Sequence, residues 1–282
     1  VHGIGNEHLY PYFAMKSGYK NVLTIHGILQ NIITDASTSD KIRLKLENLV
    51  FRKGNNFIAI SNHVKQLINK QNPIAKICNI NNSISDEFFN RKYLDRKKGF
   101  DLIMIGMIYP LKNTHLIIQI IINLKKNKKN IKVAIIGGYL PKFKSYYDKI
   151  LNDIQSNNLE NNIIMIGQVD NDKIPNYISK SRMLLHLSKY ETACMVFIEC
   201  LSMNIPIITS NVGNIQELKM RYKEVYILKN MDTNSISDEV NQILLNVNNK
   251  IIKNHSLIKN DFSLLSVALK TYNFYKKIYL ND

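Results

Sequence analysis

Two carboxylates, Glu191 and Glu199, lie eight residues apart in the most informative part of the chain. The apolar run Met183–Leu187 before them predicts a buried strand, and the run Val196–Met203 predicts a helix that carries Glu199. Eight residues cover about 12 Å along a helix, so carboxylates at this spacing could hold opposite ends of an extended ligand. The loop before the helix offers N–H groups and a positive dipole end, which favour a phosphate between the two acids.

The neighbours of Glu199 decide how much this pair means. Most glutamates at such a spacing are solvated surface charges, and the spacing alone leaves that alternative open. The residues on either side of Glu199 are apolar, however: Phe197, Ile198, Cys200 and Leu201. A carboxylate among apolar side chains needs a hydrogen-bonding partner. The sequence therefore favours a cleft that holds a polar ligand.

Short apolar, β-branched runs alternate with longer amphipathic stretches along most of the chain. We expect strands at residues 22–26, 57–61, 77–80, 102–106, 133–137, 163–167, 183–187, 205–210 and 225–228. We expect helices at residues 40–52, 63–70, 115–125, 142–156, 173–180, 196–203 and 235–247. Apolar strands that alternate with helices predict an α/β fold, in which helices cover both faces of a parallel sheet.

The alternation breaks in the polar, charged stretch Asn81–Gly99, and a new series of strands and helices begins at Leu102. We therefore expect two Rossmann-like domains with a cleft between them, where ligands bind at the carboxyl ends of the strands. The expected divisions are an incomplete N-terminal domain at 1–84, a linker at 85–99, a second domain at 100–261 and a closing helix at 262–282. Because Val1–Gly5 looks like the end of a strand and its loop, we expect further residues upstream.

The order of motifs around Glu191 and Glu199 resembles glycosyltransferase family 4, whose members have the GT-B fold of two Rossmann-like domains. A strand leads into S-K-Y-E at 188–191, and the helix with the second Glu is followed by P-I-I-T at 206–209 and V-G-N-I-Q-E at 212–217. Further motifs agree in order: T-I-H-G at 24–27, A-I-S-N at 59–62, N-S-I-S-D-E-F-F at 82–89, I-G-M-I-Y-P-L-K-N at 105–113 and I-I-G-G at 135–138. The ordered set covers the chain from Val1 to about Leu218 and is more specific than any one motif.

The resemblance implies a role for each matched position. Glu199 would hydrogen-bond to the ribose of a nucleotide-sugar donor, and Glu191 would lie beside the transferred sugar. Lys112 would offset charge on the leaving diphosphate, and His26 would face the sugar or the acceptor. The other donor contacts would come from Gly106, Met107, Gly137, Gly138, Thr192, Ala193, Cys194 and Met195.

The chain departs from the family pattern in both donor loops. Met107 stands where an arginine commonly follows the loop glycine, so one of two expected cations is absent, and Lys189 is a candidate substitute. Thr192 and Cys194 stand where the family has glycines that approach the ligand. The glycines that remain have an alternative role as ordinary turn residues: Gly106, Gly137 and Gly138.

Composition bounds the partners and the compartment. The chain has 38 Lys+Arg against 22 Asp+Glu, a formal net charge of +16, which favours anionic partners. The sequence lacks an arginine-rich tract and zinc or helix-turn-helix patterns, so we expect contact with an anionic membrane surface and none with nucleic acid. The three cysteines lack paired spacing, which indicates a reducing compartment. We therefore expect a cytoplasmic protein that binds peripherally at the inner membrane face.

The resemblance implies a retaining, hexosyltransferase-like enzyme. It would move a sugar from a nucleotide sugar to a glycan or lipid-linked acceptor in surface polysaccharide assembly. We expect no cofactor and no metal, because no cluster of ligating residues has metal-ligand spacing. One alternative is an NDP-sugar epimerase of GT-B architecture, which would need further acid/base residues. Another is a truncated nucleotide-sugar-binding remnant without catalysis, which Met107 and Cys194 favour.

Overall fold

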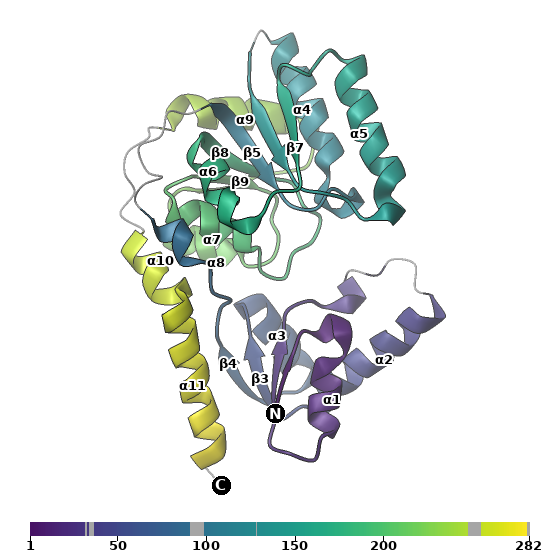
Figure 1. The fold of residues 1–282 in the computed structure, drawn as a ribbon, viewed down its shortest axis with the longest axis vertical. Coiled ribbons are helices and arrows are strands. Elements are labelled where there is room, and N and C mark those ends of the chain that lie inside the picture. The colour runs from purple at the N-terminus through teal and green to yellow at the C-terminus, as the bar shows by residue number, and fades with distance from the viewer. Residues whose placement is uncertain (32, 34–36, 91–98, 128, 248–254, 281–282) are drawn as a thin grey trace. The chain divides into compact units, whose positions relative to one another are not determined.

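The computed structural model describes residues 1–31, 33, 37–90, 99–127, 129–247 and 255–280. The chain divides into two compact units (Figure 1). Unit 1 comprises Val1–Ile84, Tyr190–Cys194 and Asn260–Asp282, and unit 2 comprises Ser85–Lys189 and Met195–Lys259. Each unit is assembled from segments that are distant in sequence, and the loop that carries Glu191 belongs to unit 1.

Unit 1 contains a parallel sheet with the strand order β1-β2-β3-β4. Its strands are β1 (His2–Ile4), β2 (Val22–Ile25), β3 (Asn56–Ala59) and β4 (Lys76–Asn79). Its helices are α1 (Tyr10–Lys16), α2 (Thr38–Lys53), α3 (Asn62–Gln71) and α11 (Leu264–Leu280). Leu23 of β2 packs in one core with α2 and α3, whereas its neighbour Val22 packs in another with Phe274 of α11. Because side chains alternate along a strand, helices cover both faces of this sheet.

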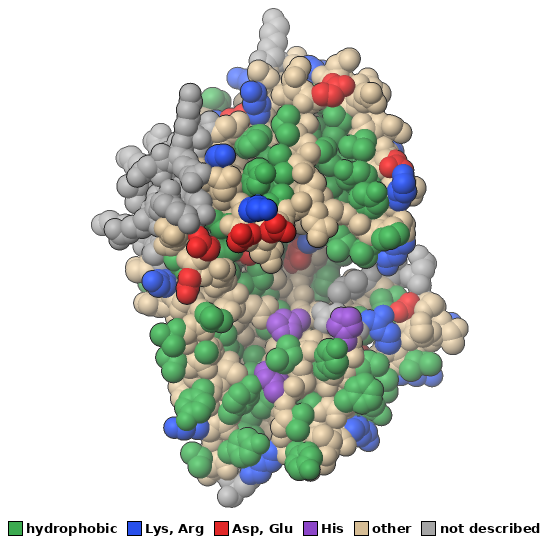
Figure 2. All heavy atoms as spheres, viewed as in Figure 1, with side chains coloured by type: hydrophobic (Ala, Val, Ile, Leu, Met, Phe, Trp, Pro, Cys, Tyr) green, Lys and Arg blue, Asp and Glu red, His purple; other side chains and the backbone are tan. Residues whose placement is uncertain are grey.

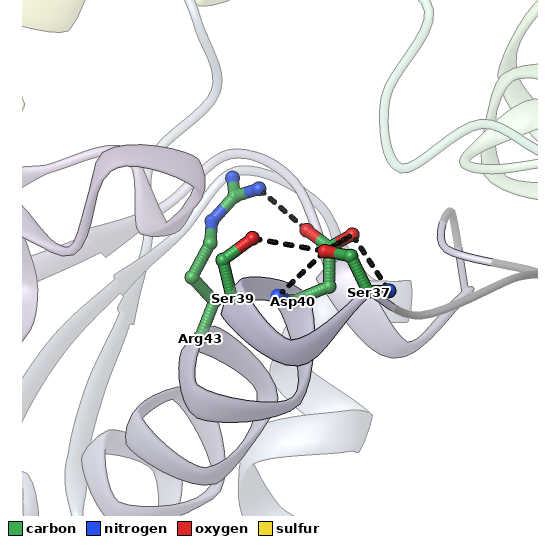
Figure 3. Close-up of polar contacts among 4 residues, drawn as sticks. All are labelled: Ser37, Ser39, Asp40 and Arg43. Carbon is green, nitrogen blue, oxygen red and sulfur yellow. Dashed lines mark hydrogen bonds and ion pairs between the residues drawn. The ribbon is translucent and has the colours of Figure 1, made fainter.

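Serine caps start the two long helices of unit 1. At α2, the Asp40 N–H donates to Ser37 Oγ (3.2 Å) and the Ser37 N–H donates to Asp40 Oδ2 (3.3 Å), a reciprocal capping box that Arg43 joins through Asp40 (Figure 3). The Ser37 hydroxyl is the main reason that the pKa of Asp40 is lowered. At α3, the Val64 N–H donates to Ser61 Oγ (3.3 Å). These caps fix where each helix begins after its preceding segment.

Unit 2 contains a six-stranded parallel sheet with the order β10-β9-β8-β5-β6-β7. Its strands are β5 (Phe100–Ile105), β6 (Val133–Ile136), β7 (Ile163–Gly167), β8 (Ser181–His186), β9 (Ile207–Thr209) and β10 (Val225–Ile227). Its helices are α4 (Thr114–Lys126), α5 (Lys144–Ser156), α6 (Ile174–Ser179), α7 (Met195–Ser202), α8 (Ile215–Arg221) and α9 (Thr233–Asn246). The order reverses between β5 and β8, which is where such sheets open a crevice for ligands.

Alternate residues of the central strands of unit 2 pack into one large apolar core. Leu102 and Met104 of β5 and Leu185 of β8 lie in this core with α4, α5 and α9. At the end of β8, the His186 ring packs edge-on against the Phe197 ring of α7, with ring centroids 5.0 Å apart. The α/β fold with parallel sheets and two Rossmann-like domains, expected from the sequence, is confirmed in the described residues.

The nine expected strands and seven expected helices all occur, with ends shifted by a few residues. Besides α10 (His255–Phe262), two short helices were not expected: α1, which leaves Tyr10 and Phe13 exposed, and α8, which has only seven residues. Neither shows a clear amphipathic period, which is the signal that sequence analysis uses.

The segments that join the units also differ from a simple polar linker. The expected linker at 85–99 begins with a 3₁₀ turn, Asp86–Phe89, whose Phe88 and Phe89 are buried. Residues 91–98 lie outside the described part of the chain. The expected closing helix at 262–282 corresponds to α11 (Leu264–Leu280). Helix α10 (His255–Phe262) precedes it, and Ile84 pairs with Ser263 between the two helices. Among the described residues, none of the helices has both the length and the apolar character needed to cross a bilayer.

Candidate functional site

The loops after β5, β6 and β7 are joined by backbone hydrogen bonds at the carboxyl edge of the sheet in unit 2. The Gly106 N–H donates to the Ile136 carbonyl (2.9 Å), and the Gly137 N–H donates to the Gly167 carbonyl (2.8 Å). The Ile108 N–H donates to the Gly138 carbonyl (2.8 Å). The glycines predicted to approach the donor therefore lie together in one layer of neighbouring loops.

Gly137 is required by this backbone approach itself. Its φ is +151°, and a Cβ at this position would lie 1.9 Å from the Gly106 carbonyl oxygen. Gly106 also has a positive φ, +147°, but a Cβ there would meet only the Lys112 Cε at 3.8 Å. The close approach of the two backbones therefore already explains why residue 137 is glycine, without a ligand. A Cβ on Gly138 would meet Gln168 Oε1 at 3.1 Å, so Gln168, which sequence analysis missed, borders the same loops.

Lys112 lies at the end of a 3₁₀ turn, Pro110–Lys112, that the end of β8 holds in place. The Leu111 carbonyl accepts hydrogen bonds from the Lys189 N–H (2.8 Å) and from Ser188 Oγ (3.3 Å). The Asn113 side-chain amide donates to the Leu187 carbonyl (2.9 Å). Lys112 Cε lies 3.8 Å from where a Cβ on Gly106 would stand, so the lysine stem passes beside the end of β5.

Met107, which stands where the family commonly has arginine, is 42% exposed beside these loops. The Lys189 side chain is also exposed, and its backbone N–H donates to the Leu111 carbonyl. Its candidacy as a substitute for the absent arginine stays a prediction.

Glu199 occupies the middle of α7 and is partly buried among apolar residues. Phe197, Ile198, Cys200 and Leu201 are all buried. In the described part of the chain, no side chain or N–H hydrogen-bonds to the Glu199 carboxylate, and burial raises its pKa to about 7. An uncompensated carboxyl of this kind is suited to bind hydroxyl groups of a ligand, because a ligand hydroxyl would replace the lost water.

The helical spacing assumed for the two acids does not apply. Helix α7 begins at Met195, so Glu191 lies four residues before it, in a segment of unit 1. The estimate of about 12 Å between the two acids assumed a continuous helix, whereas a loop and one turn of helix separate them. The prediction that a loop precedes the helix with Glu199 is confirmed.

The Glu191 loop is fixed within unit 1 through its neighbours. The Asn31 side-chain amide donates to the Tyr190 hydroxyl (3.1 Å), and burial raises the pKa of Tyr190. Ser61 Oγ donates to the Thr192 carbonyl (3.1 Å), and Ala193 packs against the core of the unit. Cys194 is buried. The residues on both sides of Glu191 are thus anchored, whereas Glu191 itself is only partly buried.

His26 follows β2 in the same unit. The Asn82 side-chain amide and His26 Nδ1 lie 3.2 Å apart, so that with the amide donating, the ring proton is on Nε2. The loop after His26 is held by Glu47, a buried carboxylate of α2 that accepts from the Leu29 N–H (2.7 Å) and from the Asn6 side chain (2.6 Å). Sequence analysis missed Glu47, although an acid on the apolar face of a predicted helix is the signal that marks it.

The predicted residues divide between the two units. Unit 2 holds Gly106, Met107, Lys112, Gly137, Gly138, Met195 and Glu199. Unit 1 holds His26, Glu191, Thr192, Ala193 and Cys194. The absence of a metal from the reaction, and the individual site roles, stay predictions.

Two curated relatives match most of this chain. The phosphatidylinositol N-acetylglucosaminyltransferase GPI3 subunit of Saccharomyces cerevisiae is 24% identical over 277 residues, which are 93% of this chain and 58% of the relative. N-acetyl-alpha-D-glucosaminyl L-malate synthase of Bacillus anthracis is 24% identical over 80% of this chain and 58% of the relative. The chain thus spans 58% of the length of these relatives.

Solved structures share the fold. Sucrose-phosphate synthase from Thermosynechococcus elongatus superposes with a TM-score of 0.81 at 16% identity, over all of this chain and 74% of that one. Anabaena HepE, solved with UDP and glucose, superposes with a TM-score of 0.78 at 13% identity, over 97% of this chain and 77% of that one. The sequence model of one family, Glycosyl transferases group 1, matches residues 85–261. Because this match covers more than half of the chain, the chain belongs to the glycosyl transferases group 1 family.

Proposed function

We propose that the protein transfers a sugar, with retention of configuration, from a nucleotide-sugar donor to a glycan or lipid-linked acceptor in surface polysaccharide assembly. The observation that carries this proposal is Glu199, a desolvated carboxyl group with a pKa of about 7 and no hydrogen-bond partner in the described residues. It stands on the helix that follows the Glu191 loop. Such a group is costly to keep in a fold unless a ligand uses it.

The residues divide the reaction between them. Glu199 accepts hydroxyl groups of the donor ribose, and Lys112 with the N–H groups at the start of α7 stabilises charge on the departing diphosphate. The acceptor hydroxyl forms a bond to the anomeric carbon on the face where the bond to the diphosphate breaks. The hydroxyl proton goes to the departing diphosphate oxygen. Glu191 and His26 orient the sugar and the acceptor, and no metal takes part.

The names of the relatives support the choice of substrates. The yeast relative acts on phosphatidylinositol, a lipid, and both curated relatives handle N-acetylglucosaminyl groups. We therefore include a lipid-linked acceptor, and UDP-N-acetylglucosamine is the first donor to test. The net charge of +16 supports work at an anionic membrane surface, on its cytoplasmic face.

Transfer can be separated from its alternatives by one assay. The protein is incubated with UDP-N-acetylglucosamine and other NDP-sugars, and release of nucleoside diphosphate is followed with and without an acceptor extract. Release that depends on the acceptor supports transfer. Interconversion of NDP-sugars would instead support an epimerase. Binding without either reaction would support a remnant, the reading that Met107 favours, and the absence of NDP-sugar binding would refute the proposal.

A substitution tests the ribose role directly. We expect Glu199→Gln to weaken UDP binding by about tenfold, or about 1.4 kcal/mol, because a neutral amide accepts hydroxyl hydrogen bonds less strongly than a carboxylate. Isothermal titration calorimetry measures the effect. Glu160→Gln, at an exposed turn of unit 2, is the matched control and should leave the affinity unchanged. Equal affinities for all three proteins would contradict the assignment.

A further inference from the structure

A pocket opens at the carboxyl edge of the unit 2 sheet, beside the turn that carries Lys112. It has a volume of about 560 Å³ and is lined by residues at the start of α4 and after β8, β9 and β10. All of its lining residues belong to unit 2. Neither Lys112 nor the glycines of the donor loops line it, and of the cations considered for the donor only Lys189 does. A pocket of this size holds a small organic molecule.

The ionisable groups in this pocket are all basic. Lys189 follows β8, Lys229 follows β10, and His115 lies in the first turn of α4. Among the residues that line the pocket in the described chain, none is Asp or Glu. The positive end of α4 adds to this field. Two lysines and a histidine, each from a different part of unit 2, therefore line one hollow without an acidic residue, which favours an anion.

The environment of His115 shows how closely these charges gather. Burial is the main reason that the pKa of His115 is lowered, and Lys189 and Lys149 lower it further, against an opposing effect of Asp153. The His115 ring also contacts the Tyr146 hydroxyl at 2.9 Å. An anion held by Lys189 and Lys229 would offset the effect of Lys189 on the ring and favour the protonated form of His115.

The neutral part of the lining indicates what the anion is attached to. Asn211 and Asn230 offer side-chain amides, and Leu228 adds apolar surface, whereas the Ser210 hydroxyl donates to the Ser188 carbonyl (2.6 Å). Cations on several sides suit a group with several oxygens and about two charges, such as a phosphate, better than a single carboxylate. We propose that this pocket binds a small phosphomonoester, with Lys189, Lys229 and His115 around the phosphate.

The pocket shares its wall with the turn that carries Lys112. Ser188 and Lys189 line the pocket and both donate to the Leu111 carbonyl, while the lining residue Asn113 is tied to Leu187. A ligand that holds the Lys189 segment would therefore also hold the turn next to Lys112. This coupling, which rests on the proposed function, predicts that a bound phosphomonoester changes the affinity for the donor nucleotide.

Isothermal titration calorimetry with glycerol 3-phosphate and with inorganic phosphate tests the pocket, and glycerol is the uncharged control. We expect both phosphates to bind, and Lys229→Gln or His115→Gln to raise the dissociation constant by about tenfold. Lys223→Gln, an exposed lysine of unit 2 outside the pocket, and Lys112→Gln should leave it unchanged. Preference for glycerol 3-phosphate over inorganic phosphate would identify an organic ligand, and equal binding would reduce the ligand to the phosphate alone.

The proposal is overturned if neither phosphate binds, if Lys229→Gln and His115→Gln bind like the unaltered protein, or if Lys112→Gln abolishes binding. The last result would place the phosphate in the donor loops. Titration of UDP with and without glycerol 3-phosphate then tests the coupling, for which we expect a change of about twofold or more. If glycerol 3-phosphate leaves the UDP affinity unchanged, the coupling is overturned. If glycerol 3-phosphate binds but UDP does not, only the proposed function is overturned.

Discussion

Glu199 is an ionisable side chain in a place from which water is largely excluded, and its pKa of about 7 records the cost of charging it there. The folded protein therefore binds a proton at Glu199 more tightly than the unfolded chain does. The stabilisation from this protonated carboxyl is fully present below about pH 4.5, the ordinary range of the group, and is lost as the pH rises through 7.

The predicted consequence is a pH-dependent difference between the protein and Glu199→Gln. Relative to the variant, the unaltered protein should lose up to about 3 kcal/mol of unfolding free energy between pH 4.5 and pH 8, since each pKa unit corresponds to about 1.4 kcal/mol. Urea denaturation of both proteins across this range measures it. Curves that stay parallel at every pH would show that burial does not perturb Glu199.

Gly137 supports a second prediction at the residue scale. Gly137→Ala should lower the unfolding free energy by about 2 kcal/mol or more, because the new Cβ would meet the Gly106 carbonyl at 1.9 Å and the residue has a positive φ. Gly167→Ala is the matched control, since Gly167 has φ +81° but open space around its Cβ position. Equal losses in the two variants, measured by urea denaturation, would mean that only the φ matters.

At the scale of elements, Ser61 joins the start of α3 to the loop that carries Glu191. Its hydroxyl accepts from the Val64 N–H and donates to the Thr192 carbonyl, and the residue is buried. A strand-to-helix turn read as a local motif in the sequence thus has a long-range partner. The same hydroxyl starts a helix and anchors a loop that is 131 residues away.

We expect Ser61→Ala to lower the unfolding free energy by about 1–2 kcal/mol, because both the cap and the loop contact are lost. Hydrogen exchange should also show faster exchange in the loop at 190–194. Ser37→Ala, which removes the cap of α2 without touching that loop, is the control. Loop exchange that is unchanged in Ser61→Ala would show that the Thr192 contact does not hold the loop.

At the scale of the whole molecule, positive charge and exposed apolar surface coincide on unit 1. Figure 2 shows hydrophobic side chains gathered over the part of unit 1 that carries α1 and α11, with Lys and Arg side chains beside them. On α11, Leu265, Leu269, Tyr272 and Tyr279 are each more than half exposed and recur at helical spacing around Lys276. This outer stripe suits an anionic lipid surface, in which apolar groups enter the interface and lysines meet the headgroups.

The protein should therefore sediment with vesicles of phosphatidylcholine and phosphatidylserine but not with phosphatidylcholine alone. Raising the salt from about 0.1 M to about 0.5 M should weaken the binding, because exposed charges are screened. Leu265→Ser with Leu269→Ser should reduce it further. Leu245→Ser, at an equally exposed leucine of α9 in unit 2, is the control. Binding that ignores either lipid charge or the α11 substitutions would contradict this surface.

The sequence by itself determined the α/β class, the nine main strands and the grouping of the glycine loops after β5 and β6. These features depend on residues that are close in the chain, such as the apolar run of β5 followed by Gly106, so local pattern is enough to show them. The family resemblance also came from the sequence, and the family model that matches residues 85–261 confirmed the family.

Only the tertiary structure decided which unit holds the Glu191 loop, why Gly137 must be glycine, and how strongly Glu199 is desolvated. Each of these depends on groups brought together from distant segments: Ser61 with Thr192, Gly137 with Gly106, and the apolar neighbours of Glu199 with the rest of unit 2. The buried Glu47 and the basic pocket are of the same kind. A single sequence shows periodicity but not desolvation, because water is excluded by the packing of whole elements and not by adjacent residues.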